Sequence, residues 1–299
     1  MTNLPRISLV TPSFNSAATI ERTICSVQNQ HYPNLQYICI DGGSTDGTTQ
    51  VIEKYSELID YFVSEPDKNA ADAINKGFIR ANGSIFCYLN ADDELMPGIL
   101  HQVATYFEQN PDIHVITGKC KRVYEDGSEV VTTVRADYYD NLSSINLLEQ
   151  PSTFWRSSLY KQAGEFDSTY YYAFDWEMWN RFKATGARFM AVDDIFSVYH
   201  FSDSNLTSRA GKKVVDEMYR AMRKYGPYRG LLAYVYLFLF HVFDMNGYYD
   251  VPFADLPPTK QKLFGATLKV LYAIFGKEKI DPYNWTWASK QIRGVVWYK

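Results

Sequence analysis

Short apolar runs that alternate with helical stretches are the feature of this sequence that most limits its fold. Runs with the length and composition of buried strands are Ile7–Val10, Leu35–Ile40, Ile59–Val63, Ile85–Leu89 and Ile113–Thr117. Helical spacing of apolar residues fills the intervals at Ala18–Val27, Thr48–Leu58, Ala70–Ala81 and Met96–Phe107. This alternation predicts an α/β fold, with a mostly parallel sheet, right-handed crossovers and flanking helices.

The pattern changes after Lys119. Alternating residues on both sides of Asp126–Gly127 predict a hairpin, and four later segments read as strand, helix, strand and strand. These segments are Thr153–Trp155, Phe174–Lys183, Arg188–Val192 and Ile195–His200. Two helices are expected beyond Ser208, so we predict a first domain over residues 1–205 and a basic, mainly helical region over residues 206–299.

The net charge of −4 hides a difference between the two parts. Residues 1–205 carry 15 Lys and Arg against 27 Asp and Glu, whereas residues 206–299 carry 15 against 7. Such a split points to a partner for the basic part, although we expect no nucleic acid. The sequence shows no signal peptide and no apolar run of transmembrane length, and its four cysteines are scattered without metal or disulfide spacing. We therefore expect a cytoplasmic protein.

Polar side chains gather where the predicted strands end, which is where open α/β sheets bind ligands. The sharpest cluster is Asn90-Ala91-Asp92-Asp93-Glu94, directly after an apolar strand. Adjacent carboxylates at the end of a core strand are costly unless a positive charge lies between them, and Mg²⁺ or Mn²⁺ commonly bridges carboxylates to phosphates. The cluster suggests a metal–diphosphate site. A polar turn that caps the next helix, with Pro97 just inside, is the alternative.

Four strings in order resemble the motifs of the family 2 glycosyltransferases, which are inverting enzymes with a GT-A fold. They are Thr11-Pro12-Ser13-Phe14-Asn15, Asp41–Thr48, Ser64–Asp67 with Asp72–Gly77, and Asn90–Asp93. The resemblance covers about Ile7–Asn205 and implies binding of a nucleotide-diphosphate sugar. The implied donor contacts are Thr11, Pro12, Phe14, Asn15, Asp41, Asp72, Asn90 and Asp92.

The resemblance also implies a divalent cofactor, Mn²⁺ or Mg²⁺, that bridges the two donor phosphates. Asp92 and Asp93 would hold it, and His200 would join them if this chain follows those GT-A enzymes that use a late histidine. The alternative for His200 is a hydrogen-bonded structural residue at a strand end. Asn90 stands where many relatives have an acid, so the metal is held more weakly or Asn90 binds the sugar instead.

The catalytic base implied by the resemblance is Asp175, which would take the proton from the acceptor hydroxyl. Glu177 competes for this role, and Phe174 stands where an acid often precedes the base. The plain alternative for Asp175 is a helix N-cap. Trp155 and Trp176, with Glu177, are the candidate acceptor contacts, although tryptophans in such segments more often belong to the core.

The basic carboxyl-terminal region contains a helix that is apolar on all sides, Leu231–Phe240, preceded by arginine and lysine. Its length fits a buried or interfacial helix. Tail aromatics follow at Trp285, Trp287, Trp297 and Tyr298. One hypothesis places this region on the anionic inner face of the membrane, near a lipid-linked acceptor. The other makes it a core or homodimer helix.

Together these features predict an inverting hexosyl- or hexosaminyl-transferase. It would move a sugar from a nucleotide-diphosphate sugar, with UDP favoured by family habit, to a hydroxyl of a saccharide or lipid-linked acceptor in cell-surface polysaccharide or glycoconjugate synthesis. Two alternatives stay open. One is a metal-dependent nucleotidyltransferase, although Thr11–Asn15 lacks the basic, glycine-rich phosphate loop expected of one. The other is a nucleotide-sugar-binding relative without catalysis.

Overall fold

The computed structural model describes residues 4–144, 146–202, 205, 211–242, 257–277 and 279–280. The chain divides into two compact units. The first holds residues 1–136 and 148–201, and the second holds residues 137–147 and 202–299. The domain boundary expected between residues 205 and 206 stays a prediction.

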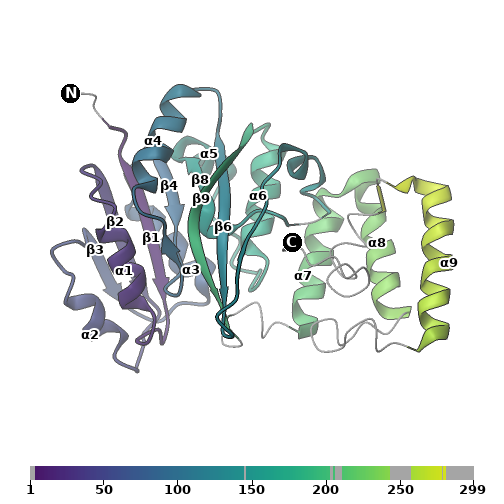
Figure 1. The fold of residues 1–299 in the computed structure, drawn as a ribbon, viewed down its shortest axis with the longest axis horizontal. Coiled ribbons are helices and arrows are strands. Elements are labelled where there is room, and N and C mark those ends of the chain that lie inside the picture. The colour runs from purple at the N-terminus through teal and green to yellow at the C-terminus, as the bar shows by residue number, and fades with distance from the viewer. Residues whose placement is uncertain are drawn as a thin grey trace. The chain divides into compact units, whose positions relative to one another are not determined.

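The first half of the sheet is parallel and has the order β3-β2-β1-β4 (Figure 1). Its strands are β1 (Ile7–Ser13), β2 (Leu35–Asp41), β3 (Tyr61–Ser64) and β4 (Ile85–Tyr88). The crossover helices are α1 (Ile20–Gln28), α2 (Thr48–Glu53) and α3 (Ala70–Arg80). These elements confirm the predicted alternation. Because the strands run the same way, their carboxyl ends and the polar loops that follow share one edge.

The second half of the sheet is mixed. Its strands are β5 (Glu94–Leu95), β6 (Val115–Tyr124), β7 (Glu129–Val131), β8 (Thr153–Arg156) and β9 (Phe189–Phe201). Strand β8 lies antiparallel between β4 and β6, β9 runs parallel to β6, and β5 is antiparallel to β9. The predicted hairpin is confirmed as β6–β7.

Strand β9 corrects one prediction, because the two late strands expected at Arg188–Val192 and Ile195–His200 are one continuous strand. The pairing of Thr117 with Ala191 is followed by that of Lys119 with Ile195, so β9 accommodates two extra residues. Asp193 and Asp194 fall in this irregularity and are exposed. Their polarity resembled a turn in the sequence, but it marks a bulge in a strand that continues.

Both faces of the sheet are covered by apolar side chains. Ile85 and Cys87 point to a cluster that also receives residues of α1, α2 and α4 (Ile99–Gln109). Phe86 and Tyr88, the alternate residues of the same strand, contact an aromatic cluster on the other face. That cluster includes residues of α3, of α5 (Ser157–Ala163) and of α6 (Phe174–Ala184). The sheet is therefore a rigid support for the loops at its edge.

The second unit contains α7 (Gly211–Tyr225), α8 (Pro227–Val242) and α9 (Pro258–Phe275), together with the 3₁₀ turn η1 (Ala136–Asn141) that leads into residues 137–147 (Figure 1). Tyr228, Arg229 and Gly230 have φ of 53°, 56° and 75°, so regular helix in α8 starts at Leu231. Across the described ranges, no helix combines the length and apolar character that spanning a bilayer would require. The tail aromatics Trp285, Trp287, Trp297 and Tyr298 lie outside the described residues.

Candidate active site

Asp41 organises the loops at the carboxyl ends of β1, β2 and β3. It pairs in register with Ser13 on one side and Ser64 on the other, and both hydroxyls donate to its carboxylate, at 2.9 and 2.6 Å. Ser44 adds its hydroxyl at 2.5 Å and its backbone N–H at 2.8 Å, and Gly43 N–H lies at 3.1 Å. Burial acts to raise the pKa of Asp41, but these hydrogen bonds outweigh it and hold the pKa below its ordinary value.

Asn15 ties the loop after β1 to the loop after β2. Its backbone N–H donates to Ser44 Oγ at 2.7 Å, and its side-chain oxygen accepts from Thr45 N–H at 3.0 Å. The φ of 48° at Asn15 is a left-handed conformation that asparagine tolerates better than most residues. The loop end therefore has one defined shape, and it presents the neighbouring Phe14 with 63% of its surface exposed.

Phe14 lies beside Gly42 and Asp67. A Cβ placed on Gly42 would come within 2.6 Å of Asp67 Oδ2 and 3.3 Å of the Phe14 ring, so a larger residue there would require the Asp67 side chain to move. Burial raises the pKa of Asp67, with the Lys76 charge opposing this shift. The structure thus brings an exposed ring and a half-buried carboxylate together. Asp67 stood in a quoted motif, but no role was predicted for it.

The other donor residues predicted in this half are more enclosed. Thr11 and Pro12 are buried in β1, and Thr11 Oγ1 lies 3.1 Å from the hydroxyl of Tyr37. Asp72 lies in the first turn of α3, where its carboxylate accepts from Lys68 N–H at 3.1 Å and its N–H donates to the capping Asn69 at 3.1 Å. In this structure Asp72 therefore supports the helix start.

Asp93 is the electrostatically most unusual residue of the second polar cluster. Its side chain is fully buried, its Oδ2 accepts from Asn90 Nδ2 at 3.3 Å, and its Oδ1 has no hydrogen-bond partner. Burial and then the neighbouring charge of Asp92 raise the pKa of Asp93 well above its usual value. Asp92 itself is half-buried. The cluster therefore holds a buried carboxylate oxygen that accepts no hydrogen bond from the described residues, although the more distant charge of Arg22 acts on it.

His200 and Glu94 meet next to this cluster. Their strands pair, and His200 Nε2 lies 2.6 Å from Glu94 Oε1. Arg22 of α1 approaches the same carboxylate at 3.2 Å and donates to the backbone oxygen of Asp92 at 3.0 Å. The structure thus brings His200 to the predicted site but gives it Glu94 as its partner. Glu94 belonged to the predicted polar cluster, but its contact with His200 was not predicted. Arg22 was not predicted, since helical periodicity alone cannot show what Arg22 contacts.

Gln150 is a further residue for which no role beside Asn90 and Asp93 was predicted. It lies in the 3₁₀ turn η2 (Gln150–Ser152) just before β8, and its side chain donates to the backbone oxygen of Tyr88 at 2.7 Å and accepts from Asn90 at 3.0 Å. Both contacts span about sixty residues of sequence. Gln150 fixes the Asn90 side chain beside Asp93.

A divalent cation at this edge can be tested against the donors present. Within the described ranges, no three His, Cys, Asp or Glu side chains converge as a ready-made metal site. Mg²⁺ and Mn²⁺ sites that act on phosphates need only one or two carboxylates, with the remaining ligands from substrate and water. Half-buried Asp92 and the unpaired Oδ1 of Asp93 meet that smaller requirement. These residues fit a cation that arrives with a diphosphate.

The two candidate bases have different surroundings. Asp175 is half-buried at the start of α6, and its Oδ1 accepts from the N–H of Trp176 at 2.6 Å. Glu177 is fully buried and forms an ion pair with Arg181 at 2.5 Å. Burial and then the charges of Asp175 and Asp93 raise the pKa of Tyr88 well above its usual range. The carboxylates of Asp175 and Asp93 therefore both lie near Tyr88. Asp175 is thus the more exposed of the two candidate bases.

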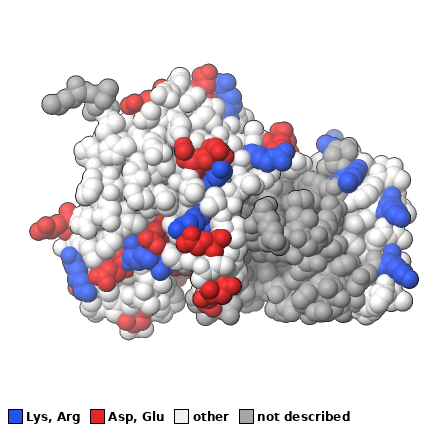
Figure 2. All heavy atoms as spheres, viewed as in Figure 1, with Lys and Arg blue, Asp and Glu red and all other residues white. Residues whose placement is uncertain are grey.

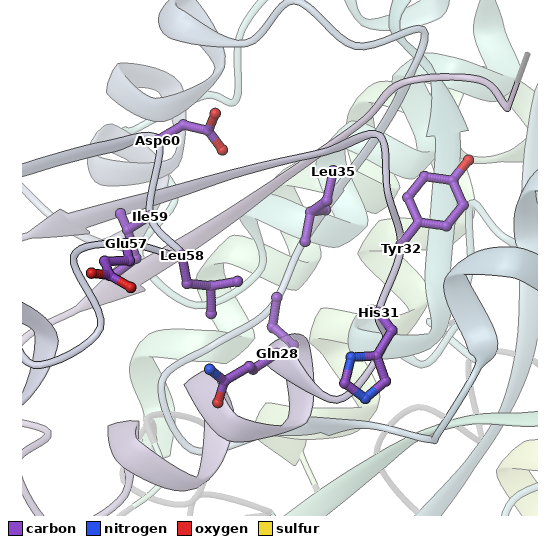
Figure 3. Close-up of a pocket in the computed structure, with 9 residues that line it drawn as sticks. Gln28, His31, Tyr32, Leu35, Glu57, Leu58, Ile59 and Asp60 are labelled. Atoms are coloured by element: carbon purple, nitrogen blue, oxygen red, sulfur yellow. The ribbon is translucent and has the colours of Figure 1, made fainter.

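The predicted acceptor tryptophans are core residues. Trp155 is 0% and Trp176 1% exposed, and the Trp155 ring lies 5.3 Å from that of Trp179. Neither ring leaves a face open to a sugar, so Trp155 and Trp176 are not acceptor contacts in this structure. A separate hollow of about 320 Å³ lies near the start of β2, at the edge of the sheet opposite to the predicted site (Figure 3). His31, Leu35 and Asp60 are among its lining residues, and it contains none of the predicted site residues.

Comparisons with known proteins agree with this geometry. The profile of the glycosyl transferase family 2 matches residues 8–165, which is more than half of the chain. A GalNAc(5)-diNAcBac-PP-undecaprenol beta-1,3-glucosyltransferase of Campylobacter jejuni is 34% identical over 101 residues, covering 32% of this chain and 33% of that protein. The chain spans between 33% and 62% of the length of the first curated relatives that it matches.

Solved structures show the same fold. S. aureus TarS 1-349 in complex with UDP superposes with a TM-score of 0.61 at 18% identity, covering 95% of this chain and 91% of that one. A mannosyltransferase from Pyrobaculum calidifontis in complex with GDP-Man and Mn²⁺ also gives 0.61, at 19% identity, covering 98% and 89%. The predicted GT-A fold is confirmed by these likenesses.

Proposed function

The chain belongs to glycosyl transferase family 2, and we propose that it is an inverting transferase that moves a hexosyl or hexosaminyl group from a UDP-sugar to a hydroxyl of a saccharide or lipid-linked acceptor. The observation that carries this proposal is the fully buried Asp93, whose Oδ1 has no partner and lies beside Asp92 at the carboxyl edge of the sheet. A carboxylate left in this state is costly without a cation, and a nucleotide diphosphate with its metal would supply one.

The donor base would bind at Phe14, whose exposed ring offers a stacking surface beside the Asp67 carboxylate. Asn15 and Asp41 would act by holding the loops in shape, since Asp41 already accepts five hydrogen bonds within the protein. Asp72 and Thr11 would line the enclosed side of this pocket. The structural neighbour solved with UDP supports this donor class. We therefore propose uracil as the donor base.

Asp92 and Asp93 would hold Mn²⁺ or Mg²⁺ together with the donor phosphates, and His200 would join them only by leaving Glu94. When bound, the cation offsets the negative charge that develops on the leaving diphosphate. Arg22 would keep the Asp92 backbone in place through its hydrogen bond, and Gln150 would do the same for Asn90. The Mn²⁺ in the archaeal mannosyltransferase supports this choice of metal.

Asp175 would act as the general base in a single displacement. It takes the proton of the acceptor hydroxyl while that oxygen forms a bond to the anomeric carbon of the donor sugar. The bond from this carbon to the diphosphate oxygen breaks, and the electron pair leaves with the nucleoside diphosphate. Glu177 cannot easily serve, because it is fully buried and paired with Arg181.

The acceptor would be a lipid-linked glycan intermediate in cell-surface glycan synthesis. The Campylobacter relative, whose name includes an undecaprenol-linked substrate, supports this acceptor class. An enzyme for such an acceptor would work at the cytoplasmic face of the membrane, in peripheral contact with anionic lipid.

A donor-hydrolysis assay tests the proposal. We expect the purified chain to release UDP from a UDP-sugar in the presence of Mn²⁺ or Mg²⁺. This release should stop when EDTA is added. Asp175→Asn should keep UDP binding and lose about 10²–10⁴-fold in transfer to an acceptor. Asp112→Asn, at an acid on the surface that pairs with Arg188, is the matched control and should change neither. Release of diphosphate from a nucleoside triphosphate, or full transfer by Asp175→Asn, would contradict the proposal.

A further inference from the structure

Helix α9 has apolar side chains on two separate faces. Phe264 and Leu268 point inward and are 2% and 8% exposed. Leu263, Val270 and Ile274 are 57%, 59% and 64% exposed. Spacings of seven and eleven residues place these three on one stripe of a helix with 3.6 residues per turn. A helix that only packed into its own unit would not need this second stripe.

Helix α8 repeats the feature. Leu231, Tyr234 and Phe238 follow the spacing of one helical face and are each about half exposed, at 51%, 49% and 52%. Single exposed apolar residues are ordinary on protein surfaces, whereas ordered stripes on two consecutive helices indicate a contact surface. Tyr234 and Phe238 are aromatic, and Tyr234 also carries a polar hydroxyl. Aromatic side chains with a polar end are enriched where a protein meets both lipid and water.

The charge of these helices narrows the choice of partner. The sequences of α8 and α9 contain no Asp or Glu. Lys262 and Lys269 are exposed, and each directly precedes one of the exposed apolar residues of α9. Figure 2 shows blue and no red over the described residues of α9, at the right edge of the view. Among the described residues of α9, the charges beside the apolar stripe are therefore positive.

We propose that the stripe Leu263–Val270–Ile274 of α9, with Lys262 and Lys269, is a docking face for an anionic lipid bilayer. An apolar stripe flanked by lysines is the pattern of a helix that lies in the interface of a membrane, with headgroup phosphates against the charges. A second copy of the same face would place lysines against lysines. This inference rests on the proposed function, because an acceptor held by lipid brings the enzyme to such a surface.

Vesicle co-sedimentation tests the docking face with the full chain. The probes are phosphatidylcholine vesicles with and without phosphatidylglycerol. One variant carries Leu263→Gln, Val270→Gln and Ile274→Gln, since Gln keeps helix propensity. A second carries Lys262→Gln and Lys269→Gln. The matched controls are Ile79→Gln, at an α3 residue that is 69% exposed, and the pair Lys54→Gln with Lys161→Gln.

The expected result is binding to the anionic vesicles only, lost in the apolar variant. The lysine variant should bind about thirtyfold more weakly, because each lysine near an anionic surface contributes about 1 kcal/mol. Controls should bind like the parent, and thermal unfolding should show all variants folded. Equal binding to neutral vesicles, binding retained by the apolar variant, or a concentration-dependent dimer lost with the same substitutions would overturn the docking face. Release of UDP from soluble UDP-sugar is the separate readout for the proposed function, and it should survive in every variant.

Discussion

Asp41 and Asp93 are two fully buried carboxylates at the same edge of one sheet, and their surroundings are opposite. Asp41 is the last residue of β2 and Asp93 follows β4, and these two strands flank β1. Asp41 accepts five hydrogen bonds from serine hydroxyls and backbone N–H groups, which lower its pKa against the effect of burial. Asp93 has one long contact from Asn90 and an unpaired oxygen, and burial raises its pKa.

This difference separates a structural acid from a ligand-binding acid. The Asp41 carboxylate has its acceptor positions filled by the protein, so its charge orders three loops. The Asp93 carboxylate has an oxygen to which the protein donates no hydrogen bond. Such a group lowers the stability of the fold, and a protein retains it where a bound ligand supplies the missing interaction. Both carboxylates are closed off from solvent, but Asp93 lies deeper in the protein than Asp41. The depth of burial and the hydrogen-bond donors around each carboxylate together make the distinction.

Asp93→Asn should give the largest effect. Transfer should fall about 10²–10³-fold, because a group that supports the developing charge is lost. The metal-free protein should become about 1–2 kcal/mol more stable at neutral pH, because an unpaired buried charge is removed. Urea unfolding in EDTA and transfer assays with Mn²⁺ measure the two quantities. If the metal-free variant were less stable than the parent, Asp93 would be a stabilising acid like Asp41, and the distinction between the two would be wrong.

Asp41→Asn should act in the other direction on stability, with a loss of about 3 kcal/mol at pH 7, because an amide leaves several buried donors without an acceptor. The folded-state pKa of Asp41 is lowered, so its contribution is present above the unfolded pKa of about 4. It is lost as pH falls through the folded value. Unfolding curves at several pH values should therefore show the gap between parent and variant closing in acid. A gap that stays constant would show that the charge of Asp41 is not the cause.

Arg22→Ala should give the smallest effect, about a tenfold fall in transfer with a higher Mn²⁺ requirement, because Asp92 loses the donor to its backbone oxygen. Arg22→Lys keeps the positive charge near Glu94, but a lysine cannot contact Glu94 and the backbone oxygen of Asp92 at the same time, as the guanidinium does. This variant should recover part of the loss. Titration of activity with Mn²⁺ separates this positioning effect from a general loss of fold. An unchanged metal requirement would remove Arg22 from the site.

Local pattern was sufficient for the first part of the fold. The strands β1 to β4 and the helices between them were predicted from the spacing of apolar residues. Each element occupies a short stretch of sequence, in which the side chains that face the core recur with the period of a strand or of a helix. The polar residues after each strand were predicted to share an edge for the same reason, because parallel strands end together. Asp92 and Asp93 were identified in this way.

The partners of those residues depended on the tertiary structure. Gln150 reaches Asn90 because β8 inserts next to β4 in the antiparallel sense, and Glu94 reaches His200 because β9 runs through its bulge as one strand. The burial of Trp155 follows from the same insertion. Pairings across sixty to a hundred residues leave no periodic signal in a single sequence. The sequence by itself therefore determined which acids stand at the sheet edge, and the packing of distant strands decided which of them has its hydrogen bonds complete and which is left open to a ligand.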